Sequence, residues 1–600
     1  MVYSTDNSIY QVEPAAVGVP GSKEELAAAL ARNYGSSAPQ PVVARGGGTG
    51  TNGQSLTSGL SVDLRRDLNE VISIDVESRR AVVQPGVVTA QLNEVLEASG
   101  LFWPPHTSTL NRATVGGMIS TDAAGKGSLV YGRAHRHVER LVMLLDDGTE
   151  WVAEPVSRAD AERQAAGQGR SAELWRSLLE IERNLADVDL GLPELARGFS
   201  GYGLDRFSDD DVINPAALLS GAEGTLGIVV EATLILSPLP VEPRLVVACY
   251  DTLNDALEDA LELRETGPSA IESFDATTLD RGRSSPAWPA LGAALGDHHG
   301  HQGAVLLLEY TGEAGSDVAA VEATIAATGR SLVRRIVDDP TEQAQIWKVR
   351  ADAVGLLAKV AVGGPELRAR PTAFVEDCAV PVAAMPAFIA AFRSLLDEAG
   401  LTYAMFGHAD VGCVHVRPAL DLTDVGQRAM VAEITGKVIA LVREHGGLVW
   451  GEHGRGFRGA HVHEVLPAET IRVMRQVKSA FDPFDIFNPG KLYRPLESSA
   501  ALVDVGDPPM RGQVDAGVPV EIRRQFDDAF ACNGNGLCHH YSVDEVMCPS
   551  YKATGDPALS PRGRVDLLRS WLADTASNGC LLYTSPSPRD ATLSRMPSSA

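Results

Sequence analysis

Short apolar runs and glycine-rich turns alternate over the first 240 residues, with few stretches of helical spacing. Apolar side chains recur at helical intervals in Glu24–Asn33 and Thr89–Ser99. Short apolar, β-rich runs predict four strands, at Val42–Ala44, Ser61–Leu64, Val71–Ile74 and Ala81–Gln84. Because helices and strands do not alternate regularly, the pattern predicts an α+β fold rather than a repeated βαβ array.

A second α+β segment begins after the proline-rich boundary at Pro238 and Pro240. Its predicted elements include strands at Leu245–Tyr250 and Ala304–Leu308 and helices at Pro386–Glu398 and Gln427–Glu444. Pro386 would lie in the first turn of its helix, where a missing N–H costs nothing. We therefore predict two domains, 20–240 and 241–495, preceded by an N-terminal extension, 1–19.

The C-terminal part of the chain differs in composition. A Pro-, Gly- and Asp-rich stretch, 496–518, is typical of a linker, and a cysteine-containing segment, 519–579, follows it. Residues 580–600 show no apolar period and resemble the translation of a sequencing-library adapter, so they are left out of the fold prediction. A disordered natural tail is the alternative. On the adapter interpretation, we expect the natural chain to be truncated here and to continue beyond residue 579.

Composition narrows the class of protein. The chain has 600 residues, 44% of them hydrophobic and 22% charged, which is ordinary for a globular protein and too long for one core. A net charge of −26 argues against wrapping nucleic acid or docking a basic patch on an anionic membrane. No apolar run approaches the roughly 20 residues of a transmembrane helix, and the N-terminus lacks a secretion signal. We expect a cytoplasmic protein, with a peripheral position at the inner face of the membrane left open.

The first chemical motif is a glycine-rich loop, Arg45–Gln54, directly after a predicted strand. Its five glycines leave backbone N–H groups unshielded, so the loop can wrap a pyrophosphate. Gly48–Gly53 matches the GxGxxG pattern of dinucleotide-binding folds, with Glu70 at a suitable distance. That fold requires a helix at this point. Since a turn and a strand follow instead, we reject this interpretation.

Three further glycine motifs follow, at Ala113–Gly125, Ser220–Ile228 and Phe481–Lys491. Each alone is weak, but together their order and spacing resemble the two-subdomain FAD-binding domain of the vanillyl-alcohol-oxidase (PCMH) type. The resemblance implies that the first two loops hold the diphosphate and adenosine, that the third lies along the flavin and that the fourth closes over it. The first loop has no histidine, so we expect non-covalent FAD. The implied cofactor residues are Arg45, Gly46, Gly47, Gly48, Thr49, Gly50, Thr51, Asn52, Thr114, Gly116, Gly117, Thr121, Glu223, Gly224, Gly227, Ile228, Asn488 and Lys491.

The C-terminal half carries a histidine pattern typical of a metal site. A hairpin of strands at Tyr403–Phe406 and Cys413–Arg417 would bring His408 and His415 side by side, and Glu452 and His453 lie on a loop after a further predicted strand. Two imidazoles and a carboxylate suit zinc or another divalent ion with open positions. A lone histidine is more often a hydrogen-bonding residue, but the GEHG motif and the flavin loops favour the metal.

Both histidine motifs resemble FAD-linked D-2-hydroxy-acid dehydrogenases. The resemblance implies metal binding by His408, His415 and Glu452, with His453 as proton acceptor. The usual Gly-Asp-Gly-Asn is replaced here by Asp410–Cys413, which removes the usual asparagine near the substrate. Arginine forks match carboxylates, and the Trp347–Arg350 segment resembles the family's substrate element. Arg350 is therefore the predicted substrate ligand and Arg370 a weaker candidate, while Arg455 and Arg458 are left open between the site and the surface.

Of seven cysteines, three gather near the C-terminus: Cys532, Cys538 and Cys548. They suggest an incomplete [4Fe–4S] site, with structural zinc as the alternative. The whole pattern resembles the bacterial type of D-2-hydroxyglutarate dehydrogenase that contains FAD and iron–sulfur, in a fragment that ends before the helical iron–sulfur domain is complete.

This resemblance implies hydride transfer from a D-2-hydroxy acid to FAD. Electrons would then leave through the cluster to a quinone or an electron-transfer protein. D-Lactate or glycolate is the alternative substrate. A non-redox flavin synthase and a flavin protein without turnover are further alternatives, and homo-oligomerisation is left open.

Overall fold

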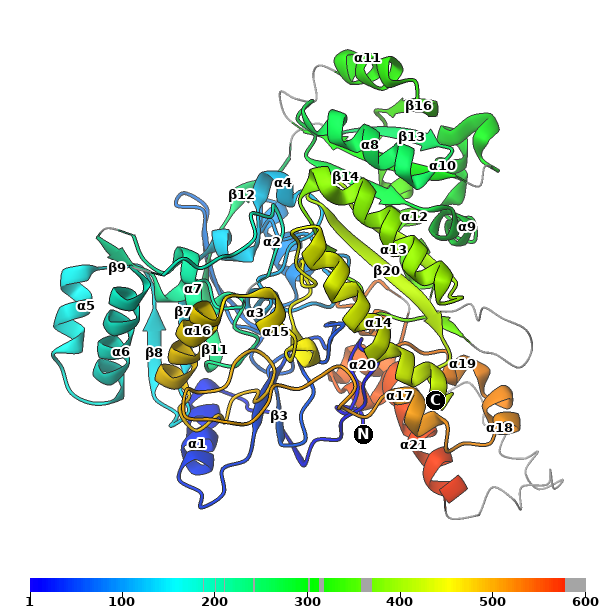
Figure 1. Ribbon diagram of the computed structural model, residues 1–600. Helices are drawn as coiled ribbons and strands as arrows, with labels where there is room; N and C mark the ends of the chain where they lie inside the picture. The colour runs from blue at the N-terminus through cyan, green and yellow to red at the C-terminus, as the bar shows by residue number, and fades with distance from the viewer. Residues whose placement is uncertain are drawn as a thin grey trace.

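The computed structural model describes residues 1–577 except 187, 200, 210, 241–242, 301–302, 312–317, 358–368 and 546. The fold is α+β, as predicted, and the two domains meet around a central region that the C-terminal helices flank (Figure 1). The predicted tail, 580–600, lies outside the described residues. Within the described ranges, no helix is both long and apolar enough to cross a bilayer.

Among its described residues, the first domain has two main sheets and two short two-stranded ones. The smaller main sheet is parallel, in the order β1-β3-β2, with β1 at Ala16–Gly18, β2 at Val42–Arg45 and β3 at Leu60–Asp63. Helix α1, Lys23–Tyr34, links β1 to β2, and its N-cap Ser22 accepts a hydrogen bond from the Glu25 backbone. Leu26 and Leu30 of α1 pack on Val42 and Val62, which accounts for the helical spacing in the sequence.

The larger sheet is antiparallel, in the order β4-β5-β11-β7-β8. Its strands are β4 (Val71–Asp75), β5 (Arg80–Val83), β11 (Ile228–Ile235), β7 (Val138–Leu144) and β8 (Glu150–Ala153). Strand β11 pairs with both β5 and β7, so the third glycine motif, which directly precedes β11, is fixed in the middle of this sheet. Helix α2, Thr89–Glu97, buries Leu92 and Leu96 in the main core.

The second domain is built on an antiparallel sheet in the order β16-β13-β15-β14-β19-β20-β17, with β18 also paired to β20. The strands are β13 (Arg244–Tyr250), β14 (Ala270–Phe274), β15 (Ala304–Tyr310), β16 (Ser331–Val337), β17 (Arg370–Pro371), β18 (Cys378–Ala379), β19 (Tyr403–His408) and β20 (Cys413–Leu420). Helices cover this sheet on two faces: α8 (Leu253–Arg264) and α13 (Met385–Glu398) on one, and α9 (Ala276–Gly282), α10 (Trp288–Leu295) and α12 (Pro340–Leu357) on the other.

Because helices cover both faces of this sheet, both faces of β13 are buried, and its sequence is a continuous apolar run. Val246 and Ala248 face the α8–α13 side, whereas Leu245, Val247 and Cys249 face the α9–α12 side. Helix α14, Val425–Glu444, packs against α13. The strand predicted before the Glu452–His453 loop is not formed: Leu448 makes only an isolated bridge to Ala379, and the segment continues as a loop.

The C-terminal segment is helical, with α17 (Arg511–Asp515), α18 (Val520–Gln525), α19 (Asp527–Phe530), α20 (Pro549–Thr554) and α21 (Pro561–Ser577). Helix α17 lies within the stretch expected to be a linker, and this part of the chain packs against the N-terminal extension. Met510 forms a bridge with Tyr10, and the Arg511 backbone donates to the Ile9 carbonyl. Figure 1 shows these helices beside the free end of β20.

Candidate functional site

One cavity of about 560 Å³ joins the glycine loops of the first domain to the histidine pair of the second. Its volume is that of an ordinary small-molecule or cofactor site. The predicted cofactor residues that line it are Gly46, Gly47, Gly48, Thr49, Gly50, Thr51, Thr114, Gly116, Gly117, Thr121, Glu223, Gly224, Gly227 and Ile228. At the other end it is lined by His408, His415, Glu452, His453, Arg350 and Arg417.

The loop glycines are required by close packing between the first two motifs. A Cβ on Gly46 would collide with the Thr114 hydroxyl, and one on Gly47 would collide with the Arg112 carbonyl. Thr114 caps α3, Val115–Ser120, by accepting a hydrogen bond from the Gly117 backbone. A backbone wall without side chains can approach a diphosphate closely. This cradle therefore fits the FAD that the motifs suggested.

Four of the predicted cofactor residues do not line the cavity and instead hold the loops in place. Arg45 donates to the Tyr3 and Thr5 carbonyls, and Asn52 donates to the Gly454 carbonyl at 2.9 Å. The Lys491 ammonium donates to the carbonyls of Gly53, Gln54 and Leu56 at 2.7–2.8 Å, and Asn488 donates to the Gln54 and Glu223 carbonyls. These hydrogen bonds brace the first loop from behind, and contact of these four residues with the cofactor stays a prediction.

The predicted metal ligands converge on one carboxylate oxygen. Glu452 Oε1 lies 3.0 Å from His415 Nε2, 3.5 Å from His408 Nε2 and 3.2 Å from His453 Nε2. Strands β19 and β20 pair directly, which brings the two hairpin histidines together as predicted. The Nδ1 atom of buried His415 has no hydrogen-bond partner among the described residues. Three imidazole nitrogens around one carboxylate oxygen fit a divalent ion.

Buried charges from three elements hold this cluster in place. The Glu272 carboxylate on β14 lies 2.6 Å from His408 Nδ1, which leaves Nε2 directed at Glu452. Arg197 contacts the second oxygen of Glu452 at 2.5 Å and also donates to the Gly125 carbonyl. Arg350 on α12 pairs with Glu272 at 2.8 Å. Neither Arg197 nor Glu272 is marked by a sequence motif, because each reaches the cluster across a domain or a sheet.

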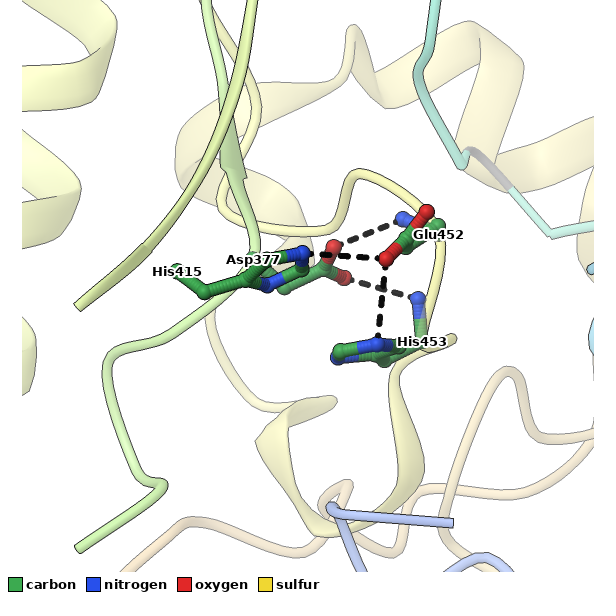
Figure 2. Close-up of side chains that lie close together, drawn as sticks. All are labelled: Asp377, His415, Glu452 and His453. Carbon is green, nitrogen blue, oxygen red and sulfur yellow. Dashed lines mark hydrogen bonds and ion pairs between the residues drawn. The ribbon is translucent and has the colours of Figure 1, made fainter. Parts of the chain in front are cut away.

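Asp377 fixes the loop that carries Glu452 and His453 (Figure 2). Its two carboxylate oxygens accept hydrogen bonds from the backbone N–H groups of Gly451, Glu452 and His453, at 2.8–2.9 Å. Asp377 lies within 4.8 Å of the ligand atoms of His415, Glu452 and His453, a group that contains His453 and not the predicted ligand His408. Since three N–H groups already occupy its oxygens, we assign it the role of a loop clamp.

The carboxylates dominate the electrostatics of this end of the cavity. Burial alone would raise the pKa of Glu452, but Arg197 and His408 hold this pKa well below its usual value. Burial alone would lower the pKa of His453, yet Asp377, Glu376 and Glu452 raise it well above its usual value. A bound divalent ion would oppose that increase by adding positive charge beside the imidazole.

Of the two arginines predicted to bind substrate, one lines this cavity and the other does not. Arg350 and Arg417 both line the cavity, with guanidinium groups 5.6 and 5.5 Å from the centre of the Phe406 ring, whereas sequence reasoning had missed Arg417. Arg370 does not line this cavity; it lies on β17, 3.4 Å from Asp527, and lines a second cavity. The surface alternative for Arg455 and Arg458 is wrong, because both are buried. Cys413, which stands where the related motif has asparagine, is also buried, with its sulfur 3.5 Å from Asp377.

The three C-terminal cysteines are partly exposed. Within the described part of the chain, they do not form a group with all ligand atoms within 4.8 Å of one another; the group centred on Glu452 is the one that does. Zinc thiolates 2.3 Å from a shared ion would lie about 3.8 Å apart. This spacing therefore does not support a preformed zinc site, and it does not test a larger iron–sulfur cluster.

Comparison with known proteins agrees with this architecture. Residues 14–153 match the model of the FAD binding domain, and residues 239–492 match the model of the C-terminal domain of FAD linked oxidases. Over these two regions, the chain belongs to the FAD-linked oxidases.

Among curated proteins, it is similar to those named D-2-hydroxyglutarate dehydrogenase from Pseudomonas putida (41% identity over 95% of this chain) and Escherichia coli (37% over 96%). The chain spans 57% and 58% of the length of these two relatives. Another relative, from Bacillus subtilis, is named glycolate oxidase subunit GlcD, with 28% identity over 82% of this chain and 92% of that protein.

A solved structure of alkyldihydroxyacetonephosphate synthase has a TM-score of 0.56 and 16% identity, over 79% of this chain and 77% of that one. This likeness concerns the fold alone.

Proposed function

We propose that this chain is the FAD- and metal-binding part of a dehydrogenase that oxidises a D-2-hydroxy acid, with D-2-hydroxyglutarate as the preferred substrate. The observation that carries the proposal is the shared cavity: the glycine cradle and the His–Glu cluster line one space of about 560 Å³. The relatives named D-2-hydroxyglutarate dehydrogenase support the choice of substrate.

FAD would be held at the cradle end of the cavity, and a divalent metal, with zinc as our choice, would be held by His408, His415 and Glu452. When bound, the flavin supplies the hydride acceptor and the ion supplies a Lewis acid for the substrate hydroxyl. Gly46 and Gly47, which have no side chains, would leave the backbone accessible to a diphosphate. Glu272 fixes the orientation of His408, and Arg197 fixes that of Glu452.

Different residues of this chain would accept the hydroxyl proton and bind the substrate carboxylate. Oxidation of the hydroxy acid removes a proton from its hydroxyl and a hydride from Cα. His453 lines the cavity and is 28% exposed, so we assign it as the group that takes the hydroxyl proton. Arg350 would hold the carboxylate next to the reacting carbon, because its planar fork matches two carboxylate oxygens. Arg370 is not retained as a substrate ligand.

Two arginines in the cavity favour a substrate with two carboxylates. Arg350 and Arg417 flank the Phe406 ring, and a five-carbon dicarboxylate would engage both in addition to their protein partners, Glu272 and Glu376. D-Lactate and glycolate carry one carboxylate and would leave one guanidinium without a substrate partner. The proteins named for these two substrates are less similar to this chain than those named D-2-hydroxyglutarate dehydrogenase. The identity is 28% for the one named glycolate oxidase subunit GlcD and 27% for one named D-lactate dehydrogenase.

The route of the electrons beyond the flavin stays a prediction. We propose that Cys532, Cys538 and Cys548 contribute to a [4Fe–4S] cluster in the full-length protein. A quinone or an electron-transfer protein on the cytoplasmic side would then be the acceptor. Iron and acid-labile sulfide analysis after anaerobic reconstitution tests this prediction, with a Cys538→Ser variant as the comparison.

The proposal is tested by anaerobic bleaching of the flavin absorbance with a panel of D- and L-2-hydroxy acids, before and after treatment with a chelator. We expect D-2-hydroxyglutarate to bleach the flavin fastest, its L-enantiomer not at all, and the chelated protein much more slowly. Faster bleaching by D-lactate or glycolate would reassign the substrate. No bleaching by any member of the panel would overturn the dehydrogenase function.

A further inference from the structure

A second cavity, of about 160 Å³, lies where the free end of β20, the N-terminal extension and the C-terminal helices meet. In Figure 1, helices α17, α18 and α19 lie around this end of the strand. Five arginines line it: Arg370, Arg417, Arg511, Arg523 and Arg569. So many guanidinium groups around one small space stand out in a chain whose net charge is −26.

Part of this charge is neutralised within the protein. Arg569 forms a two-pronged pair with Asp515, Arg417 pairs with Glu376 at 2.9 Å, and Arg370 lies 3.4 Å from Asp527. Arg511 and Arg523 differ from these three. Over the described ranges, neither comes within 4.0 Å of a carboxylate, so both guanidinium groups are left without an anionic partner.

The charge of Arg511 is unfavourable in free energy, because its side chain is buried and has no carboxylate partner within the described residues. It donates only to backbone carbonyls, those of Cys532, Asp6 and Ser8, and its Nε has no hydrogen-bond partner in the described part of the chain. A buried cation without an opposite charge costs free energy that a bound anion would recover. Burial and the neighbouring Arg569 both lower the pKa of Arg511.

The rest of the lining is mixed: Ile9, Leu420, Leu422 and Phe530 give it an apolar part, and the carboxylates of Asp421 and Asp515 lie beside neutral polar residues such as Ser8 and Asn533. A carbon skeleton can pack on the apolar part of this wall, which a bare inorganic ion would leave without a contact. In another protein, a cavity of roughly 150 Å³ holds a six-carbon ring, so a skeleton of about five carbons is of the right size here. We propose that this second cavity is a binding site for a small dicarboxylate, gripped by Arg511 and Arg523.

The site is separate from the first cavity, although the two share a wall and Cys532 of the proposed cluster also lines the second. Arg417 lines both cavities, and its partner Glu376 lies 3.3 Å from His453. A ligand in the second cavity would therefore contact the residue that helps to fix the substrate end of the first.

The test is calorimetric titration of the flavin-loaded chain with 2-oxoglutarate, in the wild type and in two variants. Arg523→Gln removes a cation from the cavity, and it is preferred to a change at Arg511, which also ties three backbone carbonyls together. Arg524→Gln is the matched control, because Arg524 neighbours Arg523 on α18 without lining the cavity. We expect two sites in the wild type and in Arg524→Gln, and one site weakened roughly tenfold to a hundredfold in Arg523→Gln.

The result also separates this inference from the proposed function. A single site that Arg523→Gln weakens would support the second cavity and count against dicarboxylate binding in the first. Binding that is equal in the wild type and in Arg523→Gln would overturn the second site. Inorganic phosphate at the same concentration should not displace the dicarboxylate from it; equal displacement would refute the assignment of a dicarboxylate.

Discussion

The two ends of the large cavity are built in opposite ways. The cradle end is mostly backbone: glycines expose N–H groups, and charged side chains such as Lys491 stand behind the loop rather than in the cavity. The reactive end is mostly side chains: buried histidines and carboxylates, held by Glu272, Arg197 and Asp377. We expect substitution of a supporting residue to have a smaller effect on function at the cradle end than at the reactive end. Each buried charge at the reactive end depends directly on its charged partners.

The largest effect is expected at the reactive end from His453→Ala. Loss of a general base lowers the rate by roughly a hundredfold to ten-thousandfold. Anaerobic stopped-flow reduction of the flavin by D-2-hydroxyglutarate measures this rate, and the flavin content checks that the cradle is intact. Near-normal reduction would show that another group takes the proton.

A smaller loss is expected from Glu272→Gln, which removes the carboxylate that orients His408. Such a partner of a metal-ligating histidine is worth roughly tenfold to a hundredfold in metal affinity. Competition with a chromophoric chelator measures that affinity. Glu265→Gln on the surface carries the same change in charge and should leave it unaltered, whereas equal losses in both variants would point to net charge alone.

At the cradle end, Lys491→Met should mainly cost stability. It leaves the carbonyls of Gly53, Gln54 and Leu56 without their buried donor, and an unsatisfied buried group costs about 1–3 kcal/mol. The free energy of unfolding is measured by urea denaturation. Lys437→Met, at an exposed pair with Glu433, serves as the control and should change it by less than about 1 kcal/mol.

The smallest effect, about tenfold in flavin affinity, is expected from Gly47→Ala, because the new Cβ would push the loop away from the Arg112 carbonyl. Gly436→Ala, on α14 with open space around it, should keep the flavin affinity of the wild type. Flavin release monitored by fluorescence separates the two variants. An unchanged affinity in Gly47→Ala would mean that the loop does not approach the cofactor closely.

Local patterns of apolar residues were sufficient to predict several of the helices and strands. Apolar patterns predicted α1, α2, β13 and the β19–β20 hairpin, because the helices bury one face that repeats along the chain and β13 is covered on both faces. The hairpin pairing then places His408 beside His415. The strand predicted before the Glu452–His453 loop failed, since this segment is a loop in which the N–H groups of residues 451–453 donate to Asp377.

The sequence by itself determined the α+β class, the glycine cradle and the residues of the His–Glu cluster, because each of these rests on short motifs that are recognisable locally in the chain. Only the tertiary structure decided that Arg197, Glu272, Asp377 and Arg417 serve the same site, that Lys491 is a brace and that Arg370 belongs to another cavity. The physical reason is that buried charges are paired through space, between elements whose separation along the chain carries no local signal.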